Sequence, residues 1–134
     1  MRTLAWLSLL VAACGGTGDG ECRVNADCGG DLACARNGEC LPANEVRAVR
    51  VTWTIRGMPA NDATCATTPT FYLLFASAQT NDTYGYSPVP CNAGLFTVDK
   101  LPKRYISVEL GVESGFAQAK AFDSQGMAAF DLMP

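Results

Sequence analysis

The spacing of the cysteines constrains the fold of this chain more than any other feature. Seven cysteines are present among 134 residues, and six of them follow Cys14. Those six are Cys22, Cys28, Cys34, Cys40, Cys65 and Cys91. An even set of cysteines in an exported chain indicates a disulfide framework. We therefore expect three disulfides, with Cys14 left for a different use.

Residues 22–41 are predicted to form a small cysteine-rich module. Glycine, asparagine and aspartate surround its four cysteines, and these residues favour turns. So short a segment cannot bury a core of its own, so two disulfides must stabilise it. Each would close a loop of about 12 residues and contribute about 2.8 kcal/mol in the chain-entropy description. Three pairings are open, and we favour the overlapping one, first with third and second with fourth.

Metal binding is the alternative interpretation of this module. Structural zinc sites usually leave roughly two to four residues between paired cysteines, whereas five lie between these, and the chain contains no histidine. We therefore expect no metal. The acidic residues nearby match no EF-hand spacing, so we expect solvated turns rather than a calcium site. They are Asp19, Glu21, Asp27, Asp31 and Glu39.

Beyond Pro42-Ala43-Asn44 the pattern changes to β-strands. Apolar residues at Val49, Val51, Trp53 and Ile55 alternate with polar ones, which is typical of a half-buried strand and assigns Trp53 to the core. Residues 70–77 are apolar on both faces, as in a central strand. Further short strands are expected near 84–89, 94–98, 106–112, 116–123 and 127–133.

Six or seven short strands without helical periodicity predict an all-β fold with one β-sandwich after the module. Within it, we expect Ile106, Val108, Leu110 and Val112 to point inward. Cys65 and Cys91 lie in loops beside the 70–77 strand. Pairing them closes about 26 residues and contributes roughly 3.5 kcal/mol in the same description.

One run resembles a family signature. Residues 94–108, Gly-Leu-Phe-Thr-Val-Asp-Lys-Leu-Pro-Lys-Arg-Tyr-Ile-Ser-Val, are similar to the G-x-F-x-V-x-x-L-P-x-G-x-Y-x-V run of transthyretin-like and carboxypeptidase-regulatory-like domains. This resemblance extends over residues 46–133. It implies a single Greek-key β-sandwich of structural or adhesive role, without catalytic residues.

The same run assigns roles to several side chains. We expect Phe96 and Val98 to enter the core, Leu101-Pro102 to form the crossing turn, and Tyr105 to anchor the next strand. Arg104 departs from the family, which usually has glycine there. In the preceding segment, the cysteine rhythm of residues 22–40 resembles the short EGF-like and dickkopf-like repeats of extracellular proteins.

The N-terminal residues have the pattern of an export signal. Arg2 precedes an apolar run that ends at Ala13, shorter than the roughly 20 residues of a membrane-spanning helix. Val11-Ala12-Ala13-Cys14 resembles the lipobox of bacterial lipoproteins, which implies a signal peptide over residues 1–13 and lipidation of Cys14. Secretion without a lipid is the alternative.

The lipidated cysteine would begin a glycine-rich flexible linker, residues 14–21. Acyl chains would then hold the protein in a membrane. By resemblance to the sorting rule of Gram-negative bacteria, Gly15 after the cysteine favours the outer membrane or cell surface.

Catalysis has little support in the composition. Without histidine, Ser-His-Asp and Cys-His constellations are excluded. Glu109 and Glu113 are expected to be solvated charges, and Lys100, Lys103 and Arg104 a small basic patch on a turn. The net charge of −3 argues against nucleic-acid binding. We expect no enzyme and no cofactor.

Two functional classes remain. The first is a membrane-anchored, non-enzymatic surface lipoprotein whose sandwich is a structural or protein-binding module. The second is a carbohydrate-binding or adhesion module. Of the aromatic residues that could stack on a sugar, including Tyr72, we favour Tyr84 and Tyr86, because they lie near a polar loop.

Overall fold

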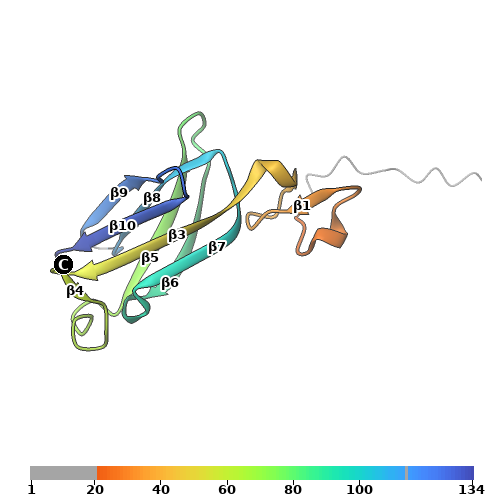
Figure 1. Ribbon diagram of the computed structural model, residues 1–134. Helices are drawn as coiled ribbons and strands as arrows, with labels where there is room; N and C mark the ends of the chain where they lie inside the picture. The colour runs from red at the N-terminus through yellow and green to blue at the C-terminus, as the bar shows by residue number, and fades with distance from the viewer. Residues whose placement is uncertain (1–20, 114) are drawn as a thin grey trace, which may run out of the picture.

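The computed structural model describes residues 21–113 and 115–134, and it is all-β, as predicted (Figure 1). The expected signal peptide, Cys14 and all of the linker except Glu21 lie outside the described residues. The cysteine module (residues 22–41) contains a single 3-10 turn, η1 (Asn25–Asp27), and a hairpin of β1 (Leu32–Cys34) and β2 (Cys40–Pro42).

A second 3-10 turn, η2 (Ala43–Glu45), leads from β2 directly into the long strand β3. The described strands of the sandwich are β3 (Val46–Ile55), β4 (Met58–Pro59), β5 (Thr70–Ser77), β6 (Thr83–Pro90), β7 (Leu95–Pro102), β8 (Tyr105–Gly111), β9 (Ala117–Ala121) and β10 (Met127–Leu132), with η3 (Cys91–Ala93) between β6 and β7.

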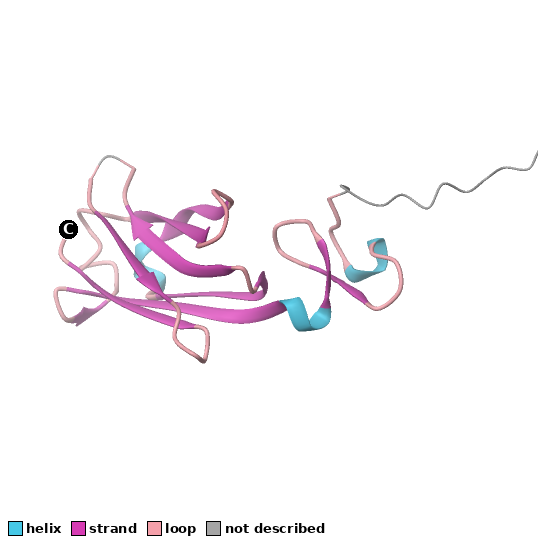
Figure 2. Cartoon of the chain, turned by 90° about the horizontal axis from the view of Figure 1, so that it is seen from above, coloured by secondary structure: helices cyan, strands magenta, loops and turns pink. Residues whose placement is uncertain are grey.

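Two sheets pack face to face. In one, β3 pairs in parallel with β10 on one side and antiparallel with β7 and the short β4. The other has the order β6-β5-β8-β9, all antiparallel. The chain moves between the sheets repeatedly, as in a Greek-key sandwich, and the cysteine module lies at one end of it (Figures 1 and 2).

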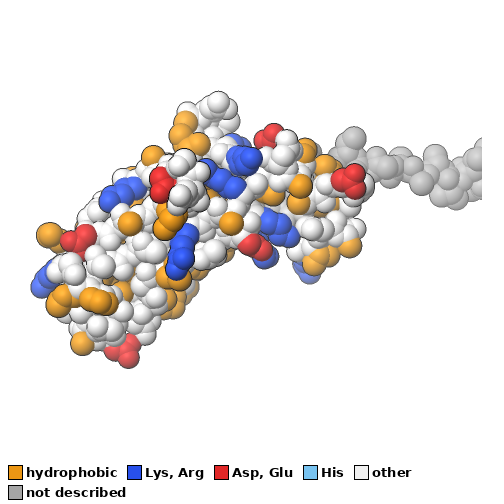
Figure 3. Space-filling view, in the orientation of Figure 1, with side chains coloured by type: hydrophobic (Ala, Val, Ile, Leu, Met, Phe, Trp, Pro, Cys, Tyr) orange, Lys and Arg blue, Asp and Glu red, His pale blue; other side chains and the backbone are white. Residues whose placement is uncertain are grey.

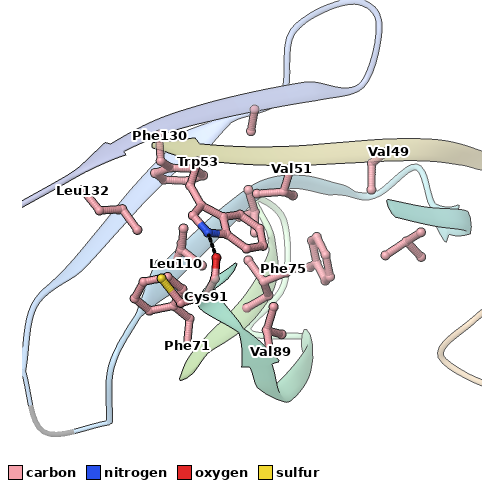
Figure 4. Packing of buried hydrophobic residues seen from close by; sticks show 14 of the residues in the cluster. Val49, Val51, Trp53, Phe71, Phe75, Val89, Cys91, Leu110, Phe130 and Leu132 are labelled. Atoms are coloured by element: carbon pink, nitrogen blue, oxygen red, sulfur yellow. Dashed lines mark hydrogen bonds between the residues drawn. The ribbon is translucent and has the colours of Figure 1, made fainter. Parts of the chain in front are cut away.

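The core follows from the period of two along the strands. Val51, Trp53 and Ile55 of β3 are buried, as the alternation predicts. Trp53 projects from β3 toward the opposite sheet, which carries Phe71 and Phe75 (Figure 4). The indole N–H of Trp53 donates to the Cys91 carbonyl at 2.7 Å, so the buried polar edge of this ring is satisfied. The Trp53 and Phe71 rings meet edge to face, with centroids 6.1 Å apart.

The three disulfides join Cys22 to Cys34, Cys28 to Cys40, and Cys65 to Cys91. The first two form the overlapping pattern that the sequence analysis favours, and the third is the local bridge. In the cysteine module, three of the sulfur-bearing side chains are themselves the buried cluster: Cys22, Cys28 and Cys34. Covalent bonds therefore replace the apolar core that this segment lacks.

The prediction of which β8 side chains point inward is wrong at Ile106. Ile106 is 45% exposed, whereas Tyr105 is buried at 1%. The pairing of β5 with β8 changes register between Ala76 and Ser77, where Ser77 lies opposite Tyr105 and Ala76 opposite Ser107. Such a β-bulge interrupts the alternation by one residue, so Tyr105 occupies the core in place of Ile106.

The predicted crossing turn is also displaced. Leu101 and Pro102 are still part of β7 and are buried, and the turn itself consists of Lys103 and Arg104. Among the described residues, Arg56 is the single non-glycine residue with a positive φ, so Arg104 turns the chain without the conformation that favours glycine. Of the two residues expected in the core, Val98 is buried and Phe96 is half-buried.

Arg56 and Gly57 form the tight turn between β3 and β4, with φ values of 51° and 74°. Asparagine tolerates this left-handed conformation better than arginine does. We expect Arg56→Asn to raise the free energy of unfolding by roughly 0.5–1 kcal/mol, measured by urea denaturation. The matched change Gly57→Ala should lower it by about 1 kcal/mol. A decrease for Arg56→Asn would instead mean that the bond from Arg56 Nη2 to the Pro134 carbonyl outweighs the strain.

Candidate ligand-binding groove where the module meets the sandwich

An arginine of the cysteine module fixes the module against β7. Arg36 reaches both carboxylate oxygens of Asp99, with Nε–Oδ1 at 2.6 Å and Nη2–Oδ2 at 2.9 Å. Its backbone N–H donates to the Lys100 carbonyl at 3.0 Å. A bidentate pair combined with a backbone bond specifies orientation as well as contact. The module is therefore docked on the sandwich rather than linked loosely to it.

Arg104 supplies a second contact between the two parts. Its guanidinium lies 2.6 Å from a Glu39 oxygen in the module and 2.8 Å from Asp82 Oδ2 in the sandwich. The hydroxyl of Tyr105 also donates to Asp82, at 2.8 Å. One cation thus bridges two carboxylates from segments far apart in sequence, and basic and acidic side chains lie close together near the junction (Figure 3).

The pKa values of these carboxyl groups reflect the contacts. Burial tends to raise the pKa of Glu39, but hydrogen bonds from Arg104 and Asn37 outweigh it, so the pKa is lowered. Hydrogen bonds from Tyr105 and Arg104 lower the pKa of Asp82. The hydrogen bond from Arg36 lowers the pKa of Asp99. All three groups are therefore held in the charged form in which they pair.

The predicted basic patch is largely engaged in these contacts. Lys100 Nζ donates to Asn25 Oδ1 of the module at 3.0 Å, and Arg104 is paired with two carboxylates. Lys103 has an exposed side chain, and its backbone N–H donates to the Glu45 carbonyl at 2.8 Å. The positive charges of Lys100 and Arg104 thus hold the module in place.

A groove of about 490 Å³ lies beside the docked arginine. Its walls combine aromatic rings with the charged pair, and its lining residues are Arg36, Tyr84, Tyr86, Phe96, Thr97, Val98 and Asp99. The rings of Tyr86 and Phe96 are 4.8 Å apart between centroids. The groove is thus built jointly by the module, which contributes Arg36, and by strands β6 and β7.

Tyr84 and Tyr86, the predicted ligand-binding residues, both lie in this groove, but they are half-buried rather than freely exposed. The Tyr84 hydroxyl donates to the Arg36 carbonyl at 2.6 Å and lies 3.2 Å from the Tyr86 hydroxyl. Burial raises the pKa of Tyr86, and the hydrogen bond to Tyr84 adds to the effect. Tyr84 and Tyr86 are two positions apart on β6, so their rings lie on the same face of the strand, and both pack against Phe75 in the core.

The other aromatic candidate lies outside the groove. Tyr72 projects from the outer face of β5, and its hydroxyl donates to Glu109 at 2.6 Å. This hydrogen bond raises the pKa of Tyr72. Glu109 was predicted to be a solvated charge; it is half-buried and accepts this bond instead, whereas Glu113 is exposed.

The sulfur atoms of Cys22, Cys28 and Cys34 lie within 4.8 Å of one another, as metal ligands would. All three belong to disulfides, however, and a disulfide sulfur is not the thiolate that zinc requires. Of the acidic residues weighed for calcium, Asp27 accepts bonds from the N–H groups of Arg23 and Val24, at 2.7 and 3.0 Å, which lower its pKa.

The sequence did not reveal the docking residues. The bond between Arg36 and Asp99 joins positions 63 residues apart, and that between Tyr84 and Arg36 joins positions 48 apart. A single sequence carries no signal for such pairs. The one available hint was Arg104, which differs from the glycine of the signature that residues 94–108 resemble and is used in docking.

No protein-family model matches the chain, and no curated protein and no solved structure shows significant similarity to it. Within residues 21–113 and 115–134, none of the helices has the length and apolar character needed to cross a bilayer.

Acid is expected to loosen the docked module. Glu39, Asp82 and Asp99 have pKa values below their ordinary 4.5, 3.8 and 3.8 when docked. Their contribution is therefore complete above about pH 5 and is lost as the pH falls through the lowered values. Amide chemical shifts of residues 22–41 should change together between about pH 5 and pH 2. Arg104→Gln should loosen the module already at neutral pH. The ion pairs do not hold the module if these amide shifts fail to change together with pH in the wild-type protein and are also unaltered at neutral pH by Arg104→Gln.

Proposed function

We propose that this protein is an exported lipoprotein, anchored by acyl chains on Cys14 at the outer membrane or cell surface of a bacterium. The supporting observation is the complete pairing of the six cysteines that follow Cys14. Disulfides persist in oxidising compartments outside the cytosol. Because none of the six remains to pair with Cys14, that thiol is available for the lipid that the lipobox-like segment implies.

Its role would be that of a non-enzymatic structural or protein-binding module. The cysteine module, similar to EGF-like and dickkopf-like repeats, would lie nearest the membrane and hold the sandwich by the pairs of Arg36 and Arg104. The sandwich, similar to transthyretin-like and carboxypeptidase-regulatory-like domains, would present its strands and loops to a partner. A docked module gives the sandwich one orientation, which a flexible tether would not.

Lipidation has a direct test. We expect the native protein to partition with membranes and its N-terminal peptide to begin at an acylated Cys14, identified by mass spectrometry. Cys14→Ser should move the protein to the soluble exported fraction with its three disulfides intact, because two or three acyl chains make attachment effectively permanent. Cys65→Ser, which leaves the lipobox unchanged, is the control and should stay membrane-bound. A soluble wild-type protein would reject the anchor.

A carbohydrate-binding role is the second candidate, and the groove beside Arg36 favours it. Sugar sites commonly combine an aromatic surface with planar hydrogen-bonding groups. Here Tyr86 and Phe96 supply the surface, and the exposed Arg36–Asp99 pair supplies donors and acceptors. The two opposite charges neutralise each other, which suits an uncharged ligand.

A glycan array with the purified protein tests this candidate. If it is right, Tyr86→Ala should weaken binding about fivefold, since one aromatic contact contributes about 1 kcal/mol. Arg36→Ala should weaken it as well. Tyr72→Ala, on the outer face of the neighbouring strand β5, is the matched control and should bind normally. Absence of binding to any glycan, or equal loss with Tyr72→Ala, would reject the groove as a sugar site.

A further inference from the structure

β7 has a free edge at one side of its sheet. β7 pairs with β3 along one edge, and within the described part of the chain no strand pairs with the other. Unpaired strand edges are templates for another strand, and proteins usually protect them. Leu95, Phe96, Thr97 and Val98 form an uninterrupted run of residues that favour strands.

The hydrogen bonds of β3 show which groups of β7 are free. Arg50 donates to the Gly126 carbonyl on the β10 side, so the backbone groups of the next residue, Val51, face β7. Val51 lies opposite Phe96. Because these directions alternate along a strand, the N–H and carbonyl of Thr97 point away from β3. The bond from Trp53 to the Gly94 carbonyl follows the same alternation.

The edges of β10 and β6 carry features that hinder strand addition. Lys120 of β9 donates to the Ala129 carbonyl of β10 at 2.6 Å, and Gln118 approaches the Asp131 carbonyl at 3.4 Å. These side chains cover β10 groups that a new strand would need. β6 carries Pro88 and Pro90, which lack the N–H of a ladder. β7 has no proline before Pro102.

The cysteine module already uses the far end of this edge. The N–H of Arg36 donates to the Lys100 carbonyl, as a neighbouring strand would. A segment added along Leu95–Asp99 would continue this established contact. The side chains of the added segment that point toward the sheet containing β6 would cover Tyr86, Phe96 and Val98, which line the groove.

We propose that β7 binds an extended segment of a partner protein by strand addition, antiparallel or parallel to residues 95–99. This inference rests on the protein-binding role proposed above and specifies its mode. Backbone bonds to Thr97 supply affinity, and an apolar residue at every second position of the segment fills the groove. Since Arg36 and Asp99 neutralise each other, the segment carries no net charge where it passes them.

The test uses the full chain in mild detergent and a phage-displayed library of 12-residue peptides as the probe. Selections are run on the wild-type protein, on Thr97→Pro and on Thr97→Ala. Proline removes the outward N–H without breaking a bond to β3, whereas alanine keeps it. Far-UV circular dichroism and intact disulfides verify that both variants fold.

We expect the wild-type protein to select peptides with apolar residues at alternate positions. Relative to the wild-type protein, Thr97→Pro should bind these peptides with about tenfold lower affinity, and the affinity of Thr97→Ala should change by less than about twofold. The amides of Leu95 and Thr97 should exchange more slowly in the complex. Peptides bound equally by Thr97→Pro would overturn strand addition while leaving a protein-binding role intact. Self-association abolished by Thr97→Pro would replace the partner with a second copy. Selection of no peptide by the wild-type protein would count against both proposals.

Discussion

Two overlapping disulfides stabilise the cysteine module in place of an apolar core, and the docking of the module on the sandwich depends on them. Cys22, Cys28 and Cys34 are the buried cluster of a segment with few other apolar side chains. Each bridge removes chain entropy from the unfolded state, which a segment of this size cannot offset by burial alone. Once β1 and β2 are held together, the short turn between them presents Arg36 and Glu39 to the sandwich at fixed positions.

The junction shows how charge can orient two parts whose buried apolar clusters are separate. Arg36 is bidentate to Asp99, and Arg104 bridges Glu39 and Asp82. Exposed ion pairs contribute little to stability one at a time. Here they act together with backbone hydrogen bonds and with the bond from the Tyr84 hydroxyl, so their main effect is to fix the orientation of the module. The groove and the covered end of β7 are both products of that geometry, because each includes a residue of the module.

Local pattern predicted the strands and missed what distant segments impose on them. The alternation through Trp53 placed β3 and its buried face correctly, because a period of two is a property of neighbouring residues. Ile106 was misplaced because its bulge is set by pairing with β5, which lies about thirty positions earlier. The overlapping disulfides were one of three pairings that spacing allows. The groove was predicted only through Tyr84 and Tyr86, since Arg36 and Asp99 meet across 63 positions.

The parallel pairing of β3 with β10 has a consequence for how the chain reaches this state. β3 opens the sandwich and β10 is its last strand, with Thr54 and Asp131 joined across 77 positions. Contacts between such distant segments must close a long loop, which has an entropic cost and slows folding. Phe130 and Leu132 of β10 belong to the same buried cluster as Trp53, so part of that packing depends on this distant pairing. Until β10 has joined the sheet, β3 therefore lacks its parallel neighbour, and Trp53 lacks two of the side chains that share its buried cluster.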